Sequence, residues 1–186
     1  MFPVSITDER GVMLREFTAD DVDAVLAVYG DPKVTEHLSF EPRTRDQVKA
    51  TLDSVTAAAR VEPRTEYSLA VVHGGEVIGV ARLAVDTQHP GQSSGQLGFA
   101  LRASHWGRGL GAATVRLLLR LGFDELGLYR LWGARSPENV VSARLMTALG
   151  MVEEGRIRGH IRVRGRWRDS VVHSILADEW QADQQR

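Results

Sequence analysis

The stretch Leu97–Gly111, LGFALRASHWGRGLG, is the most informative part of the chain. Its apolar alternation predicts a strand over 96–102, and the glycines that follow predict a turn that opens directly onto a helix. Glycine lets the backbone approach a ligand closely, and the first N–H groups of a helix have no partners within it. Because the helix dipole and Arg108 add positive charge, the stretch predicts a phosphate-binding site.

Outward from this stretch, strand and helix signals alternate along the chain. The N-terminal signals are a strand at 11–17, helices from Thr18 to about Tyr29 and from Thr44 to about Arg60, and a hairpin of 67–73 and 76–84 joined by Gly74-Gly75. The C-terminal signals are a helix at 109–126, a strand at 129–135, a helix that starts at Ser136-Pro137-Glu138-Asn139 and ends at Gly150, and strands at 151–163 and 167–177. This order predicts a mixed α+β sheet with helices on its faces, and not a doubly wound sheet.

Composition narrows the possible functions. The 186 residues fit one domain, with a frayed tail over 181–186, and the absence of cysteine excludes thiolate chemistry. A formal net charge of −1 does not favour nucleic acid as a partner. The start of the chain lacks the pattern of a secretory signal and no apolar run is long enough to cross a bilayer, so we expect a cytoplasmic protein without a membrane partner.

Two other glycine motifs compete for the turn. A P-loop would need a lysine, which the turn lacks. A dinucleotide fingerprint fits only in its looser form, Gly107-x-Gly109-x-x-Ala112, and it belongs in the first strand–helix unit of a parallel sheet, whereas this turn lies past the middle of the chain. A small nucleotide-binding oxidoreductase stays as an alternative on that motif alone.

Three blocks in order resemble the GNAT superfamily of N-acetyltransferases, in the branch of the RimJ/RimL ribosomal-protein acetyltransferases. The first block is Trp106–Gly111, which matches the pyrophosphate motif Q/R-x-x-G-x-G/A with tryptophan in the first place. The other blocks are Pro137-Glu138-Asn139-x-x-Ser142 with Leu149-Gly150-Met151, and Gly165–Asp169 with Ser174-Ile175-Leu176 and Glu179-Trp180. The resemblance covers nearly the whole chain and implies one N-acetyltransferase domain over 1–186, with about seven strands and about four helices.

The resemblance also implies acetyl-CoA, or another acyl-CoA, as co-substrate. The strands at 96–102 and 129–135 would splay apart around it, with the pantetheine arm paired to backbone groups as though it were a strand. The residues expected to hold it are Phe99, Ala100, Leu101, Trp106, Gly107, Arg108, Gly109, Leu110, Gly111, Ala112 and Asn139.

Catalysis needs a proton for the leaving thiolate. Many family members use a tyrosine seven residues after the helix asparagine, but Met146 holds that position here, so the resemblance favours Ser142 as the acid, with Asn139 beside it. Both residues also have a structural interpretation, since they lie in the first turn of a helix and could serve its cap.

The general base and the acceptor site are less defined. The candidate bases are Glu36, Glu41, His160, Asp169 and His173, and a water relay or an amine that arrives neutral would need none. An amine-bearing acceptor, which would be a ribosomal-protein-like N-terminus or a small molecule, is expected across the sheet from CoA, lined by the loop of 34–43 between the first two helices and by the hairpin loop of the 160s. Its candidate contacts are Glu36, Glu41, His160, Trp167 and Asp169. No cluster of ligands predicts a metal. We expect a monomer or homodimer, and a CoA-binding regulatory or interaction module that has lost catalysis is the alternative function.

Overall fold

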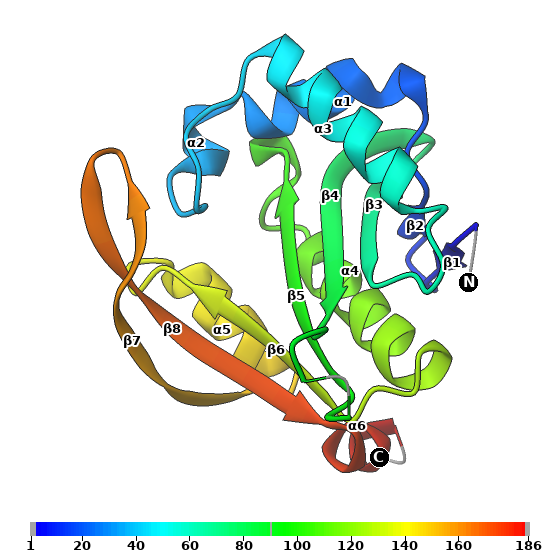
Figure 1. Cartoon of the computed structure of the whole chain (residues 1–186), viewed down its shortest axis with the longest axis vertical. Coiled ribbons are helices and arrows are strands. Elements are labelled where there is room, and N and C mark those ends of the chain that lie inside the picture. Colours follow the sequence, from blue (N-terminus) through cyan, green and yellow to red (C-terminus); the bar gives the residue numbers. More distant parts are fainter. Residues whose placement is uncertain (1–2, 90, 185–186) are drawn as a thin grey trace.

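One eight-stranded sheet runs through the molecule in the computed structural model, which describes residues 3–89 and 91–184 (Figure 1). From edge to edge the strands follow the order β1, β2, β3, β4, β5, β6, β8, β7. All neighbouring pairs are antiparallel except β5 and β6, which are parallel. The strands are β1 (Ser5–Thr7), β2 (Met13–Arg15), β3 (Glu66–His73), β4 (Glu76–Val85), β5 (Ser94–Leu101), β6 (Arg130–Arg135), β7 (Val152–Val163) and β8 (Arg166–Leu176).

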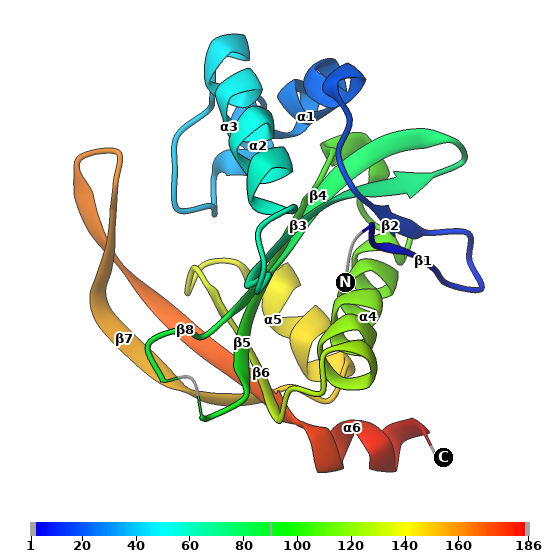
Figure 2. The same cartoon turned by 45° about the vertical axis from the view of Figure 1, so that its right-hand side comes forward.

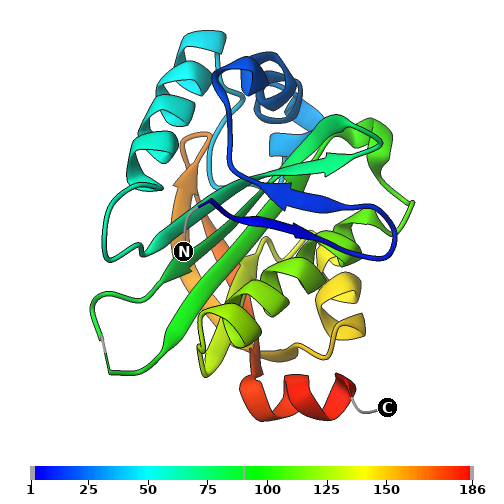
Figure 3. The same cartoon turned by 90° about the vertical axis from the view of Figure 1, so that its right-hand side faces the viewer.

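Helices cover both faces of the sheet. They are α1 (Val22–Tyr29), α2 (Pro32–Thr35), α3 (Arg45–Ala58), α4 (Leu110–Arg120), α5 (Val140–Ala148) and α6 (Ala177–Gln184). Three short helical turns precede α1 or flank α4. They are the 3-10 turns η1 (Ala19–Asp21) and η2 (Ala103–His105) and the π-helical turn η3 (Leu121–Glu125). Figures 2 and 3 show α4 and α5 on one face and α1, α2 and α3 on the other.

The alternation along β3 explains this two-sided core. Leu69 and Val71 pack into the cluster that contains the apolar residues of α4, while Ala70 and Val72 pack into the cluster with α1 and α3. Because successive side chains of a strand point to opposite faces, a run of consecutive apolar residues is buried on both sides. The mixed α+β class predicted from the element order is therefore confirmed.

Local signals placed several elements correctly. The hairpin of β3 and β4 turns at Gly74 and Gly75, whose φ angles of 60° and 83° suit glycine. Thr44 and Gln47 form the predicted capping box of α3.

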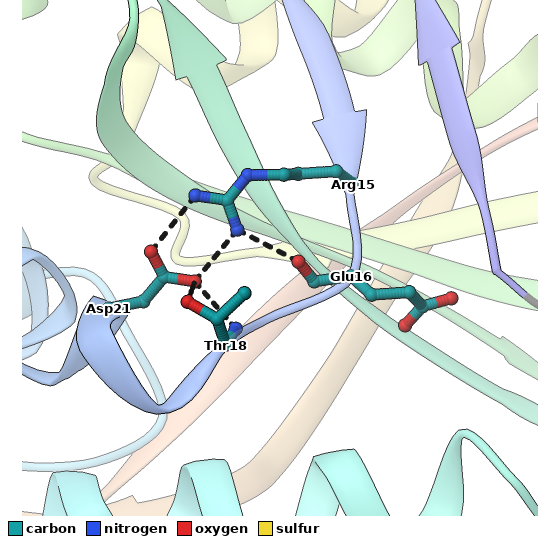
Figure 4. Close-up of polar contacts among 4 residues, drawn as sticks. All are labelled: Arg15, Glu16, Thr18 and Asp21. Atoms are coloured by element: carbon teal, nitrogen blue, oxygen red, sulfur yellow. Dashed lines mark hydrogen bonds and ion pairs between the residues drawn. The ribbon is translucent and has the colours of Figure 1, made fainter.

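The start of α1 is held by a buried carboxylate. Asp21 accepts hydrogen bonds from the Thr18 N–H and from both terminal nitrogens of Arg15, at 2.8, 2.8 and 2.9 Å (Figure 4). Burial raises the pKa of Asp21, but these hydrogen bonds outweigh it and the pKa lies below its ordinary value. The carboxylate thus ties β2 to α1.

The structure departs from the predictions where elements are short or depend on distant contacts. Strand β1 and helix α2 have three and four residues, too short to show a period, so there are eight strands and six α-helices among the described residues. Helix α6 extends to Gln184, into the stretch where the sequence predicts a frayed tail, and Trp180 of this helix stacks on Phe123 and donates to Asp124 at 3.0 Å. Residues 185 and 186 lie outside the described chain.

The start of α5 also differs. Ser136 does not cap the helix. Asn139 does, and α5 begins at Val140.

Candidate functional site

The glycine turn leads directly into α4. Gly107 and Gly109 have φ angles of 73° and 78°, and Gly109 is the residue that caps the helix. No side chain caps α4, so its first N–H groups are free to bind an anion. The side chains of Arg108 and Leu110 do not reach the cavity described below, and Leu110 is buried in the core.

Strands β5 and β6 part beside this turn. They pair only at Ser94–Arg130, Gly95–Leu131 and Gln96–Trp132, so the rest of β5 has one open edge. This confirms the splayed strands that the resemblance implies. Figure 1 shows the two strands diverging upward from their lower ends.

The open edge offers only some of the expected backbone groups. Leu101 lies opposite Gly79, and the Arg102 N–H donates to the Ile78 oxygen at 2.8 Å. By antiparallel alternation, the backbone groups of Ala100 therefore face β4, while those of Phe99 and Leu101 face the open edge. Ala100 is thus misassigned as a backbone partner of a ligand, although it lines the cavity.

Trp106 takes part of that edge for itself. Its indole N–H donates to the Leu101 oxygen at 2.9 Å, although the residue as a whole is 51% exposed. The N–H of Leu101 and both groups of Phe99 stay available for a ligand.

A cavity of about 800 Å³ joins the turn, the open edge and two helices. It brings together residues of α2, the end of β5, the glycine turn and the first turns of α5. The predicted residues that line it are Glu36, Phe99, Ala100, Leu101, Trp106, Gly107, Gly109, Gly111, Ala112, Asn139 and Ser142. The lining residues that sequence reasoning missed are Lys33, His105, Glu138, Val140, Val141, Arg144 and Leu145. Val34, His37 and Leu38, which also line the cavity, belong to the loop of 34–43 that the sequence analysis places beside the acceptor.

Most of the missed residues had no signal of their own. Lys33 reaches the cavity from the short helix α2, whose four residues are too few to show a periodic pattern in the sequence. Glu138 and Leu145 could have been found, since they lie within one helical turn or two of Asn139 and Ser142.

The first turn of α5 places Asn139 and Ser142 together. The Asn139 side-chain oxygen accepts the Ser142 N–H at 2.9 Å, so Asn139 is the helix cap. Its amide nitrogen and the Ser142 hydroxyl make no hydrogen bond among the described residues, and both residues line the cavity. Met146, which holds the position of the tyrosine used by many family members, is buried in the core and does not line the cavity.

The remaining predicted contacts lie elsewhere. Glu41, His160, Trp167 and Asp169 do not line the cavity. Asp169 accepts the Gly159 N–H at 2.8 Å and an Arg156 hydrogen bond at 2.7 Å, and these contacts lower its pKa. Its role in this structure is to hold an irregular stretch of β7.

His173 is buried in β8 and is also absent from the cavity. Its Nε2 atom accepts a hydrogen bond from Arg135 at 3.1 Å, and burial, with the charge of Arg135, lowers its pKa. A buried histidine held by an arginine, away from the cavity, is poorly placed as a general base there.

The cavity itself carries titratable groups of both signs. Glu36 and Glu138 are its carboxylates, and Lys33 and Arg144 are its cations. The pKa of His105 is lowered by burial and by the charges of Arg108 and Arg102, which favours the neutral imidazole. Glu36 is therefore the one sequence-predicted base candidate that lines the cavity.

No group of three or more potential metal ligands occurs in the described residues. Likewise, no helix among them is long and apolar enough to span a membrane.

Comparisons with known proteins agree with this geometry. A family profile described as "Acetyltransferase (GNAT) domain" matches residues 12–152. The chain is 28% identical to the uncharacterized N-acetyltransferase p20 of Bacillus licheniformis, covering 90% of this chain and 93% of the relative. It is 25% identical to the ribosomal protein uS5-alanine N-acetyltransferase of Escherichia coli over 56% of this chain and 54% of that enzyme.

Solved structures share the fold. A putative acetyltransferase from T. thermophilus is 31% identical with a TM-score of 0.81, covering 100% of this chain and 96% of the other. Mycobacterium smegmatis RimJ in complex with CoA-disulfide is 21% identical with a TM-score of 0.79, covering 95% and 88%.

Proposed function

The chain belongs to the GNAT acetyltransferase family, and on that premise we propose that it transfers acetyl from acetyl-CoA to a primary amine, either a protein N-terminus or a small-molecule amine. The observation that carries the proposal is the cavity in which the α4 turn, the open edge of β5 and the first turn of α5 meet. Such a cavity can align a thioester with an amine, and in this reaction the enzyme contributes mainly by holding the two reactants in the correct orientation.

The residues at the cavity suit acetyl-CoA. The free N–H groups at the start of α4 fit a pyrophosphate, and a Cβ atom at Gly107 would meet nothing within 4 Å, so there is room for one. The backbone of Phe99 and the Leu101 N–H fit the amides of a pantetheine arm. When bound, acetyl-CoA supplies the activated thioester.

The first turn of α5 would handle the proton. Ser142 donates its hydroxyl proton to the departing sulfur, and the hydroxyl is restored by a proton from solvent. A protonated amine first gives one proton to Glu36 or to a water, because only the neutral amine has a lone pair for the attack. The C–N bond then forms as the C–S bond breaks, and the nitrogen releases its second proton to water. Asn139 orients this turn through its bond to the Ser142 N–H, with its amide nitrogen left for the ligand.

The acceptor is proposed from the cavity charge and from the relatives. Glu36 and Glu138 would attract a protonated amine. The uS5-alanine specificity named for the Escherichia coli relative supports a protein N-terminus as the first candidate.

Substitution of Gly109 tests the CoA site. Gly109→Ala forces a residue with a Cβ atom into φ 78°, at 2.6 Å from Arg10 Nη1. The free variant relieves this strain of about 1–2 kcal/mol by moving the turn out of its present conformation. Acetyl-CoA binding must reverse that shift, so we expect a roughly tenfold loss of affinity in calorimetry. Gly127→Ala is the matched control, since Gly127 also has a positive φ of 62° but lies outside the cavity. Equal affinity in the wild type and in Gly109→Ala would rule out this site.

An acceptor screen tests the reaction. Release of the CoA thiol is measured with N-terminal peptides of ribosomal proteins and with small amines. Release with peptides alone supports the protein N-terminus, and release with small amines alone supports the other acceptor. Binding of acetyl-CoA without release for any acceptor would contradict acetyl transfer.

A further inference from the structure

Two arginines of the β7–β8 hairpin reach across to α2. Arg164 donates to the backbone oxygens of Thr35 and Glu36 at 3.1 and 3.2 Å. Arg168 donates to those of His37 and Leu38 at 3.0 and 3.2 Å. We call these four hydrogen bonds the clasp. They join segments about 130 residues apart, and Figure 1 shows the turn of the hairpin rising towards α2.

The segment at the end of α2 has few hydrogen bonds of its own. The Leu38 N–H donates to the Thr35 oxygen at 3.1 Å, while the oxygens of Glu36, His37 and Leu38 accept, among the described residues, only from the two arginines. Arginine can donate to several oxygens at once and is favoured near a helix C-terminus. The clasp therefore fixes a segment that its own backbone bonds would leave loose.

The contacts of Arg168 are not those expected of an arginine that only stabilises the fold. Arg168 makes no ion pair with a carboxylate in the described part of the chain, and its Nε atom is buried without a partner. Burial and the neighbouring charge of Arg164 lower the pKa of Arg168. Arg168 is half-buried, and the charge of Glu138 only partly offsets the cost of burial. Because this placement costs free energy without a direct ion pair, it is better explained by positioning.

The residues held by the clasp form one wall of the cavity. Glu36, His37 and Leu38 give their backbone oxygens to Arg164 and Arg168, and all three line the cavity. We propose that Arg164 and Arg168 are positioning residues that hold Glu36, His37 and Leu38 in place as the acceptor-side wall. The inference rests on the proposed function for the identity of the acceptor, but the clasp itself is tested separately.

The clasp also connects the two parts of the sheet at the end where strands β5 and β6 lie apart. Strands β5 and β6 are joined by three residue pairs at their narrow end, and the clasp links the two sides again beyond the cavity. Loss of the clasp would free Glu36 and Leu38 from the hairpin and so displace this wall of the cavity. Acetyl-CoA contacts lie on the opposite side, at the glycine turn and β5.

Distance measurement tests the clasp without activity. The chain has no cysteine, so Ser39→Cys and Arg166→Cys can be spin-labelled uniquely on either side of it. We expect a narrow distance distribution in the labelled parent and a broader one after Arg168→Ala. An unchanged distribution would overturn the proposal.

Kinetics test the positioning role. Arg164→Ala and Arg168→Ala should raise the acceptor KM and lower kcat/KM about tenfold or more, while acetyl-CoA affinity stays within about twofold. Arg166→Ala is the matched control, because it removes the same charge from the same hairpin and the Arg166 side chain makes no hydrogen bond or ion pair among the described residues. Arg168→Lys, which keeps the charge but loses the fork of donors, should recover only part of the loss.

The outcomes separate the two proposals. Failure of the wild type to bind acetyl-CoA would defeat the proposed function and leave the distance test of the clasp standing. Equal effects of Arg166→Ala and Arg168→Ala, or a loss of acetyl-CoA affinity as large as the loss for the acceptor, would overturn the clasp as an acceptor-side device.

Discussion

At the residue scale, the pair Asn139 and Ser142 serves structure and chemistry with different atoms. The Asn139 oxygen and the Ser142 N–H form the helix cap, which leaves the serine hydroxyl and the asparagine amide to the cavity. The positive end of the α5 dipole lies at this turn and favours a negative charge developing nearby. The capping role and the proposed catalytic role are therefore compatible.

Ser142→Ala separates these two roles, because alanine keeps the backbone N–H and removes only the hydroxyl. We expect kcat to fall about 100-fold, the lower range for a lost general acid, with acetyl-CoA affinity unchanged. Steady-state kinetics and calorimetry measure the two quantities. Thr147→Ala, on the same helix but outside the cavity, is the control, and full turnover in Ser142→Ala would point to another proton donor.

At the element scale, strand β7 depends on one carboxylate in its partner strand. The register of β7 and β8 shifts between Ile157 and Ile161, and Asp169 binds the Gly159 N–H inside that shift. A β-bulge leaves backbone groups without ladder partners, so a side chain must satisfy them. The GRWRD block thus shapes the hairpin that carries Arg164 and Arg168.

Asp169→Asn should loosen this part of the hairpin, seen as faster hydrogen exchange at residues 157–161. The hydrogen bond from Gly159 and the contact with Arg156 lower the folded-state pKa of Asp169 below 3.8. A lowered pKa means that the stabilisation is present above pH 3.8 and is lost as the pH falls through the folded value. The wild type should therefore approach the variant's exchange pattern in acid, after correction for intrinsic rates, and a hairpin unaffected by both changes would contradict this role.

At the scale of the whole molecule, few backbone pairs join the two parts of the sheet. Strands β5 and β6 pair at three residues at one end and the clasp joins the other end, while one apolar core, with Leu97 and Leu131 in it, packs under both parts. A ligand paired to the open edge of β5 that also touches α5 would bridge the two parts.

Acetyl-CoA should therefore stabilise the molecule as a whole. At a concentration about 100 times Kd, linkage predicts a gain of about 2.7 kcal/mol in the free energy of unfolding, measured by denaturant titration. Hydrogen exchange should slow on β5 and on α5 together. Protection confined to α4 would contradict a ligand that bridges the two parts.

Local signals in the sequence account for most of the fold and for the side of the cavity that the glycine turn and β5 form. The Gly74-Gly75 hairpin, the Thr44 capping box and the glycine turn each depend on residues within a few positions of one another, and all three are found. The resemblance added the splay of β5 and β6. These features could be read because turn and cap geometry is local.

The wall of the cavity formed by Glu36, His37 and Leu38 depends on contacts between distant parts of the chain. Glu36 and Asp169 were equal candidates in the sequence, yet the fold turns Glu36 into the cavity and uses Asp169 to hold β7. Helix α2 has no periodic signal, and its position depends on hydrogen bonds from Arg164 and Arg168, about 130 residues away. Sequence patterns report the conformation of neighbours along the chain, whereas this wall exists only because packing brings two remote segments together.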